Sequence, residues 1–245
     1  HDPRRILVVA ESAAGKRYGV DTTYLDTVMA DLTAHAKSYP PAFDTPQDRQ
    51  RATQDVRVLT GMLDRLVNGP DTSPELLVRA AHLHGIGHNL EIPGSAEKAN
   101  GYFLRLLAAV PDEPRGNFMY GTFLAGVGKG REAIPYLDKA LALGVVDAAY
   151  ALGLTQLSIG EKDKAVLILQ EYKRRKPGDP NIDRLKPSIG SLTCTLPFGD
   201  GVDAHPCKTS THAAHARALN PLRVGYFIFL LLWPLQQRAC PLRPC

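Results

Sequence analysis

The fold is decided by residues 86–103 (IGHNLEIPGSAEKANGYF), because their pattern recurs at 120–137 (YGTFLAGVGKGREAIPYL) and at 152–169 (LGLTQLSIGEKDKAVLIL). In each stretch an alanine follows a glycine by 12 residues: Gly87 and Ala99, Gly121 and Ala133, Gly153 and Ala165. The glycines are 34 and then 32 residues apart, a spacing typical of arrays of helix-turn-helix units. We therefore expect stacked helical hairpins.

Larger residues occupy matching places around each small pair. They are Ile86, Leu90, Phe103 and Pro111 in the first unit, Tyr120, Leu124, Leu137 and Ala140 in the second, and Leu152, Leu169 and Pro177 in the third. Two helices approach closely where both carry small residues, and the large side chains fill the space on either side. Turn residues separate the two halves of each unit, for example Pro93-Gly94. The pattern therefore predicts antiparallel helix pairs.

This pattern resembles the tetratricopeptide repeat (TPR), which combines a small-residue pair with apolar anchors and a terminal proline. The resemblance covers about residues 80–179. It departs from the family at the first anchor, where Leu83, Asn117 and Ala149 replace the usual tryptophan, and at Val145, where proline is missing. It implies an all-α fold, a right-handed superhelix of antiparallel helical hairpins (a TPR-like α-solenoid). Three repeats, at about 80–113, 114–145 and 146–179, would make up residues 73–179.

The N-terminal residues 1–20 are expected to form an arm. The apolar run Ile6–Ala10, followed by Gly15-Lys16, is similar to a strand that enters a phosphate-binding loop. That loop requires glycine where Ala10 stands and serine or threonine where Arg17 stands. We therefore expect an extended arm that packs on the first helices, without nucleotide binding.

Residues 21–72 predict two helices. The first begins near Asp21 with Thr22 or Thr23 as its cap and ends at Tyr39-Pro40-Pro41. The second begins at Thr45-Pro46 and stops at Asn68-Gly69-Pro70. We expect an atypical antiparallel hairpin that caps the array, since terminal units of solenoids differ from the internal ones.

The composition changes abruptly in the C-terminal segment 180–245, which we expect to be an irregular tail. It holds the four cysteines of the chain, Cys194, Cys207, Cys240 and Cys245. Its apolar run Gly225–Leu235 is about half the length that a bilayer span requires, so no transmembrane span is expected. Three interpretations stay open: a disulfide-linked extension of unknown pairing, a zinc site, or non-native sequence from a frameshift or read-through.

Composition and motifs exclude several function classes. The formal charge of +4 is small for 245 residues, and only Lys173–Lys176 is a basic cluster, at a predicted helix end where cations are favoured. We therefore expect no nucleic-acid partner. The chain has no Gly-x-Ser-x-Gly, His-Glu-x-x-His or intact phosphate-loop motif. We expect a non-enzymatic protein without a cofactor.

The printed chain begins at His1 and not at methionine. We expect that a secretory signal was removed, which predicts a bacterial periplasmic or secreted protein, with a cytoplasmic location as the alternative.

The resemblance also implies where a partner binds. In such arrays the first helix of each unit lines a concave groove, and the groove side chains lie three residues before the glycine, one after it and four after it. These positions are His84, His88 and Glu91 in the first unit, Phe118, Thr122 and Ala125 in the second, and Tyr150, Leu154 and Leu157 in the third, and Arg115 and Asp147 lie one turn earlier. We expect a peptide or a partner protein there, held by apolar contact and shape.

His84, His88 and Glu91 also suggest a metal site, because their spacing places them on one face of a helix. The alternative, which we favour, is that they are hydrogen-bonded or hydrated groove residues. The sequence thus predicts a TPR-type interaction scaffold, with possible self-association through an uncapped apolar end. The other candidate is a periplasmic accessory protein that binds a small ligand or metal between the N-terminal hairpin and the first repeat.

Overall fold

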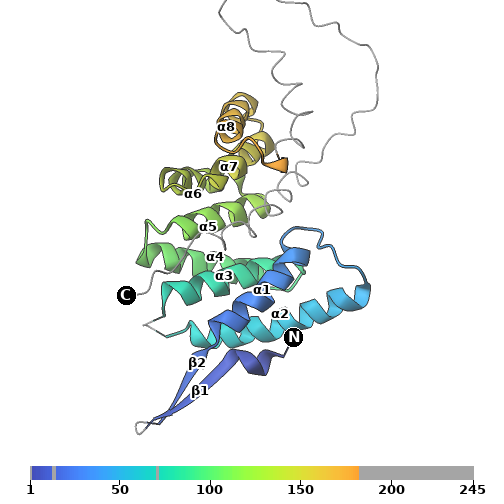
Figure 1. Ribbon diagram of the computed structural model, residues 1–245, viewed down its shortest axis with the longest axis vertical. Helices are drawn as coiled ribbons and strands as arrows, with labels where there is room; N and C mark the ends of the chain where they lie inside the picture. Colours follow the sequence, from blue (N-terminus) through green and yellow to red (C-terminus); the bar gives the residue numbers. More distant parts are fainter. Residues whose placement is uncertain (1, 13–14, 70–71, 182–245) are drawn as a thin grey trace, which may run out of the picture.

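The computed structural model describes residues 2–12, 15–69 and 72–181, and most of these residues are helical (Figure 1). The N-terminal elements are η1 (Pro3–Ile6), β1 (Leu7–Ser12), β2 (Gly15–Val20), α1 (Thr22–Ala36) and α2 (Pro46–Leu66). The remaining helices are α3 (Pro74–Asn89), α4 (Ser95–Ala109), α5 (Pro114–Gly126), α6 (Gly130–Ala142), α7 (Asp147–Ser158) and α8 (Lys162–Arg175). The predicted helical fold class is confirmed.

The N-terminal arm is a β-hairpin and not a plain extended segment. β1 and β2 pair antiparallel, with Leu7 opposite Val20. The Asp21 amide donates to the Ile6 carbonyl at 2.8 Å, and Ile6 itself is buried, which anchors the base of the hairpin to the helices. The strand in the run Ile6–Ala10 therefore leads into a second strand and not into a phosphate-binding loop.

The first two helices begin at polar caps but do not form the predicted pair. Asp21, and not Thr22 or Thr23, caps α1, because its carboxylate accepts a hydrogen bond from the Tyr24 amide at 2.9 Å. Thr45 caps α2 as the sequence predicts. Both helices make more backbone contacts with α3 and η1 than with each other. Helix α3 thus joins the N-terminal helices to the array.

Three helical hairpins follow, and they stack in chain order (Figure 1). Helices α3 and α4, α5 and α6, and α7 and α8 pack as pairs, and α4 with α5 and α6 with α7 join successive pairs. Helix α5 also contacts both α3 and α7. The first helices of the three hairpins therefore lie side by side. The handedness of the array stays a prediction.

Glycines allow close packing within the hairpins, but against a different partner from the one the sequence predicts. A Cβ on Gly121 would lie 2.7 Å from Leu137 Cγ, and one on Gly153 would lie 2.5 Å from Leu169 Cγ. These leucines are four residues beyond the alanines that the pattern pairs with the glycines. Both are buried. Gly121 and Gly153 therefore each accommodate a leucine of the second helix, whereas Gly87 of the first hairpin accommodates Ser95.

Aromatic rings connect consecutive helices at the centre of the array. The Tyr120 ring lies 5.3 Å from the Phe103 ring and 4.5 Å from the Tyr136 ring. Phe103 also contacts Phe123 at 5.8 Å. These rings join α4, α5 and α6 into one apolar core.

Among the residues that the structure describes, no helix combines the length and the apolar character needed to cross a bilayer. The four cysteines and the apolar run 225–235 lie outside the described residues.

Candidate functional site

The sequence-predicted groove residues lie on three adjacent helices. His84 and His88 are on α3, with Glu91 just after its end; Arg115, Phe118 and Thr122 are on α5; Asp147, Tyr150 and Leu154 are on α7. Because α5 contacts both α3 and α7, the fold brings these helices together. The role of these residues in binding a partner stays a prediction.

Four members of this set are less accessible than an open groove requires. Phe118, Thr122, Tyr150 and Leu154 are 6, 5, 2 and 4% exposed. The arrangement of the helices gives a physical reason, since α5 packs against α3, α4, α6 and α7, and α7 packs against α5, α6 and α8. The Tyr150 ring, for example, lies 5.5 Å from the Tyr172 ring of α8. These four side chains therefore contribute to the core, whereas His88 and Arg115 are half-buried.

Asp147 connects α7 to the end of α8. Lys176 Nζ donates to its carboxylate at 2.5 Å, and Tyr172 Oη lies 3.2 Å from the same oxygen. Tyr172 also donates to Asp179 at 2.5 Å. Burial, and then the Asp179 carboxylate, raise the pKa of Tyr172. Lys176 of the predicted basic cluster thus forms an ion pair inside the array.

The structure does not bring His84, His88 and Glu91 together as metal ligands. Glu91 is exposed and accepts hydrogen bonds from Arg49 Nη2 at 2.7 Å and Tyr39 Oη at 2.9 Å. Within the described ranges, no group of three histidine, cysteine or acidic side chains is close enough to hold a metal ion. The metal hypothesis for this triad is wrong, because Glu91 is directed to α2 and the chain before it.

His84 belongs instead to a polar cluster that we call the Asp64 junction, formed by Asp64, His84, Lys98 and Tyr102. His84 Nε2 and Tyr102 Oη each lie 2.7 Å from Asp64 Oδ1, and Lys98 Nζ lies 2.5 Å from Asp64 Oδ2. The junction connects α2, α3 and α4 through one carboxylate. Sequence reasoning missed it, although Asp64 lies one turn from the buried residues Thr60 and Val67 on the same face of α2.

Opposing effects set the protonation of the Asp64 junction. Burial raises the pKa of Asp64, but hydrogen bonds from Lys98, His84 and Tyr102 together hold that pKa below its ordinary value. Burial lowers the pKa of His84, although Asp64 partly opposes this. His84 is therefore a neutral imidazole at pH 7 that donates its Nε2 proton to the Asp64 carboxylate. The His84 side chain is only 4% exposed, so the cluster is built to hold helices together.

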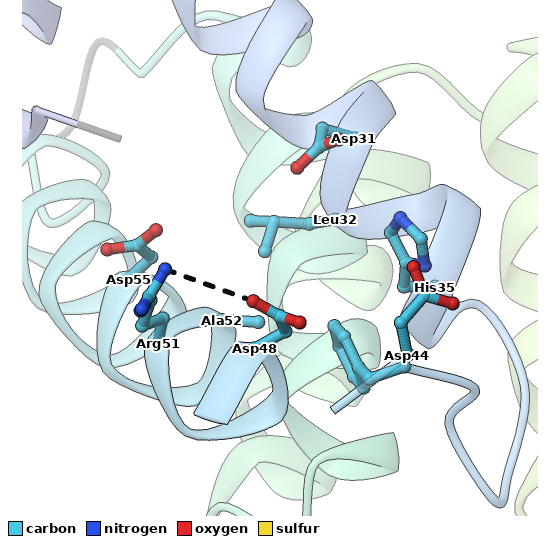
Figure 2. Close-up of a pocket in the computed structure, with 9 residues that line it drawn as sticks. Asp31, Leu32, His35, Asp44, Asp48, Arg51, Ala52 and Asp55 are labelled. Carbon is cyan, nitrogen blue, oxygen red and sulfur yellow. Dashed lines mark ion pairs between the residues drawn. The ribbon is translucent and has the colours of Figure 1, made fainter. Parts of the chain in front are cut away.

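A pocket with a volume of about 240 Å³ lies between α1 and α2 (Figure 2). It is lined by Asp31, Leu32 and His35 of α1, by Phe43 and Asp44 of the connection, and by Asp48, Arg51, Ala52 and Asp55 of α2. His35 stacks on Phe43 with ring centroids 5.4 Å apart. The Arg51 guanidinium lies 3.9 Å from Asp48, as the dashed line in Figure 2 marks. Four carboxylates against one arginine make the lining acidic.

The position of this pocket differs from the sequence expectation. For the alternative function, the sequence analysis places a ligand pocket between the N-terminal hairpin and the first repeat. The pocket lies between α1 and α2, which each pack on α3.

The stacked hairpins define the class of this protein as a helical-repeat protein with a TPR-like arrangement. A scan against protein-family models finds no match, and a comparison with curated proteins finds none. Among solved structures, a "Crystal structure of MamA" is 22% identical with a TM-score of 0.48, and the match covers 61% of this chain and 84% of that chain. A "Crystal structure of MamA protein" is 21% identical with the same TM-score, and covers 69% and 81%.

Proposed function

We propose that this protein is an interaction scaffold that binds a peptide or a segment of a partner protein along α3, α5 and α7. The observation that supports the proposal is the contact of α5 with both α3 and α7, which sets the first helices of three hairpins side by side. Extended ligands bind such faces through several modest contacts spread over successive units.

The side chains on this face have two roles in the proposal. Phe118 and Tyr150 are buried and give the face its shape. The half-buried His88 and Arg115 reach polar groups of the partner. A guanidinium is suited to a carboxylate or a backbone carbonyl, since it presents several donors in a fixed plane.

The test begins with a phage-displayed library of linear peptides that is selected on the full chain. The affinity of the selected peptide is then measured by fluorescence anisotropy for the wild type and for Arg115→Ala, with Arg131→Ala as the matched control. Arg131 also lies in the first turn of a helix, but on α6 and exposed. We expect Arg115→Ala to weaken binding at least tenfold and Arg131→Ala to change it less than twofold.

Two results contradict this function: no enriched peptide, or equal affinities for both arginine variants. Thermal unfolding followed by circular dichroism is recorded for each variant, so that a loss of binding is separated from a loss of fold.

We further propose a bacterial envelope location, with the cytoplasm as the alternative. Fractionation of host cells, with detection by antibody, distinguishes the two.

A second candidate function is the binding of a small cationic ligand in the pocket between α1 and α2. The observation that favours it is the combination of a cavity of about 240 Å³ with four aspartates and the Phe43 ring. This volume is below the roughly 300–1,000 Å³ of typical ligand pockets, so it suits a small amine. Calorimetric titration with putrescine tests it. We expect binding that Asp48→Asn weakens and that Asp163→Asn, an exposed control on α8, leaves unchanged; absence of heat with the wild type contradicts it.

A further inference from the structure

The β-hairpin projects from the helical body (Figure 1) and carries a run of exposed apolar residues. Leu7, Val8 and Val9 of β1 are 40, 47 and 50% exposed. Successive side chains of a strand point to opposite faces, so Val8 lies on one face of the hairpin and Leu7 and Val9 lie on the other. Both faces therefore present apolar surface to water.

The backbone of β1 also has an outer edge. The sheet contains two strands in the part of the chain that the structure describes, so β1 has β2 on one side. The hydrogen bond from the Asp21 amide to the Ile6 carbonyl makes Ile6 and Asp21 a hydrogen-bonded pair. Because such pairs alternate along an antiparallel ladder, Val8 bonds to β2, and the N–H and C=O groups of Leu7 and Val9 point outward.

We propose that this edge pairs with the β1 strand of a second copy of this chain, so that two hairpins form one four-stranded antiparallel sheet. An isolated two-stranded hairpin is marginally stable in water, and additional strands with apolar faces stabilise it. Natural edge strands are usually protected by charges, prolines or bulges, but residues 7–9 have none of these.

The occupant is a second copy because the segment is complementary to itself. With Val8 on a two-fold axis, the outward groups of Leu7 face those of Val9 in the other copy, which makes hydrogen-bonded pairs. The two Val8 residues then form a non-hydrogen-bonded pair, the type with the closest side-chain approach. Apolar side chains meet apolar side chains on both faces, and the contact closes as a symmetric dimer.

The first experiment tests the register with disulfide cross-links in full-length protein whose four native cysteines are replaced by serine. Val8→Cys places two thiols across the axis, where the Cα atoms of a non-hydrogen-bonded pair are about 4.5 Å apart. Leu7→Cys places its thiols on residues that are not opposite one another. We expect a covalent dimer on a non-reducing gel for Val8→Cys and much less for Leu7→Cys. Equal cross-linking, or none, overturns the proposal.

The second experiment measures the oligomeric state by sedimentation velocity. We expect the wild type to be a dimer and Val8→Lys a monomer, since two ammonium groups would meet at the axis. Val58→Lys is the matched control, because Val58 on α2 is also exposed, at 36%, and lies away from the hairpin. A wild-type monomer, or a dimer that persists in Val8→Lys, overturns the proposal. If another protein or the apolar run 226–233 of the same chain covers β1 instead, the wild type is a monomer or the dimer persists in Val8→Lys. Either occupant therefore overturns the proposal.

Discussion

At the scale of single residues, the glycines of the hairpins set the distance between paired helices. A Cβ on Gly121 would lie 2.7 Å from Leu137 Cγ and 3.2 Å from the Leu137 backbone nitrogen. Because Leu137 is fully buried and its backbone belongs to α6, displacement of either atom disturbs the packing of the core. We expect Gly121→Ala to lower the free energy of unfolding by about 1–2 kcal/mol, the overpacking cost less the helix propensity gained.

The matched control is Gly61→Ala in α2. An added Cβ at Gly61 meets no atom within 4 Å, and the residue is exposed within the helix. Alanine there adds helix propensity without a clash, so we expect a gain of about 0.5–1 kcal/mol. Urea denaturation measures both variants. Similar changes at Gly121 and Gly61 would show that the leucine contact does not control the hairpin.

We expect the stability of the fold to depend on pH through His82. Its Nε2 lies 3.0 Å from Thr33 Oγ1, and the Thr33 hydroxyl donates to the Met29 carbonyl at 2.5 Å. His82 therefore donates its Nε2 proton to Thr33 and is neutral. Burial, and then the positive charge of Arg115, lower the pKa of His82 to about 3.

A depressed histidine pKa means that the unfolded chain binds a proton more readily than the folded chain. The contribution of neutral His82 to the stability of the fold is complete above the unfolded pKa of about 6.5, and it is lost progressively as the pH falls toward 3. We expect His82 to account for a loss of about 2 kcal/mol between pH 7 and pH 5. Urea denaturation at both pH values should show a smaller loss for His82→Gln than for the wild type. Equal losses would contradict the burial of a neutral His82.

At the scale of elements, the Asp64 junction holds α2 on the first helical hairpin. Removal of the carboxylate leaves His84 and Tyr102 without their acceptor inside the protein, and Lys98 without its ion pair. We expect Asp64→Ala to destabilise the fold by about 2–3 kcal/mol. Asp112→Ala is the control, since Asp112 pairs with Lys139 at 2.9 Å on the surface and its side chain is 78% exposed. Exposed pairs contribute less than about 1 kcal/mol, so a similar loss in both variants would argue against the junction.

Elements with local signals could be predicted from the sequence, and elements set by distant contacts could not. Thr45-Pro46 starts α2 because a cap and a proline act within one turn. The separation of α1 from α2 depends on how each packs against α3, which no local pattern encodes. The Asp64 junction likewise joins residues separated by 20, 34 and 38 positions.

For the candidate site the sequence offers only a location, and the role of that location in binding stays a prediction. The resemblance to the TPR family implies groove positions on α3, α5 and α7, and the structure sets these helices side by side. The pattern does not show how deeply each side chain is buried. Phe118 and Tyr150 occupy predicted groove positions, yet contacts from neighbouring helices bury both. Accessibility depends on the whole array, whereas the repeat pattern describes one unit at a time.

At the scale of the whole molecule, stability is distributed unevenly along the array. In stacked repeats each unit is stabilised by its own packing and by its neighbours, so central units open less often than terminal ones. Among the helices that the structure describes, α5 packs against four, α3, α4, α6 and α7, whereas α8 packs mainly against α7. Local opening at the α8 end of the described array therefore exposes α8 without disturbing α5.

Hydrogen exchange followed by mass spectrometry tests this distribution. We expect amides in the middle of α5 to exchange at least tenfold more slowly than those in the middle of α8, a difference of about 1.4 kcal/mol in opening free energy. Leu152→Ala in α7 provides the internal comparison, because this fully buried residue lies in the last hairpin that the structure describes. It should accelerate exchange in α7 and α8 more than in α3. Equal protection of α5 and α8, or uniform acceleration in the variant, would mean that the described helices open as one cooperative unit.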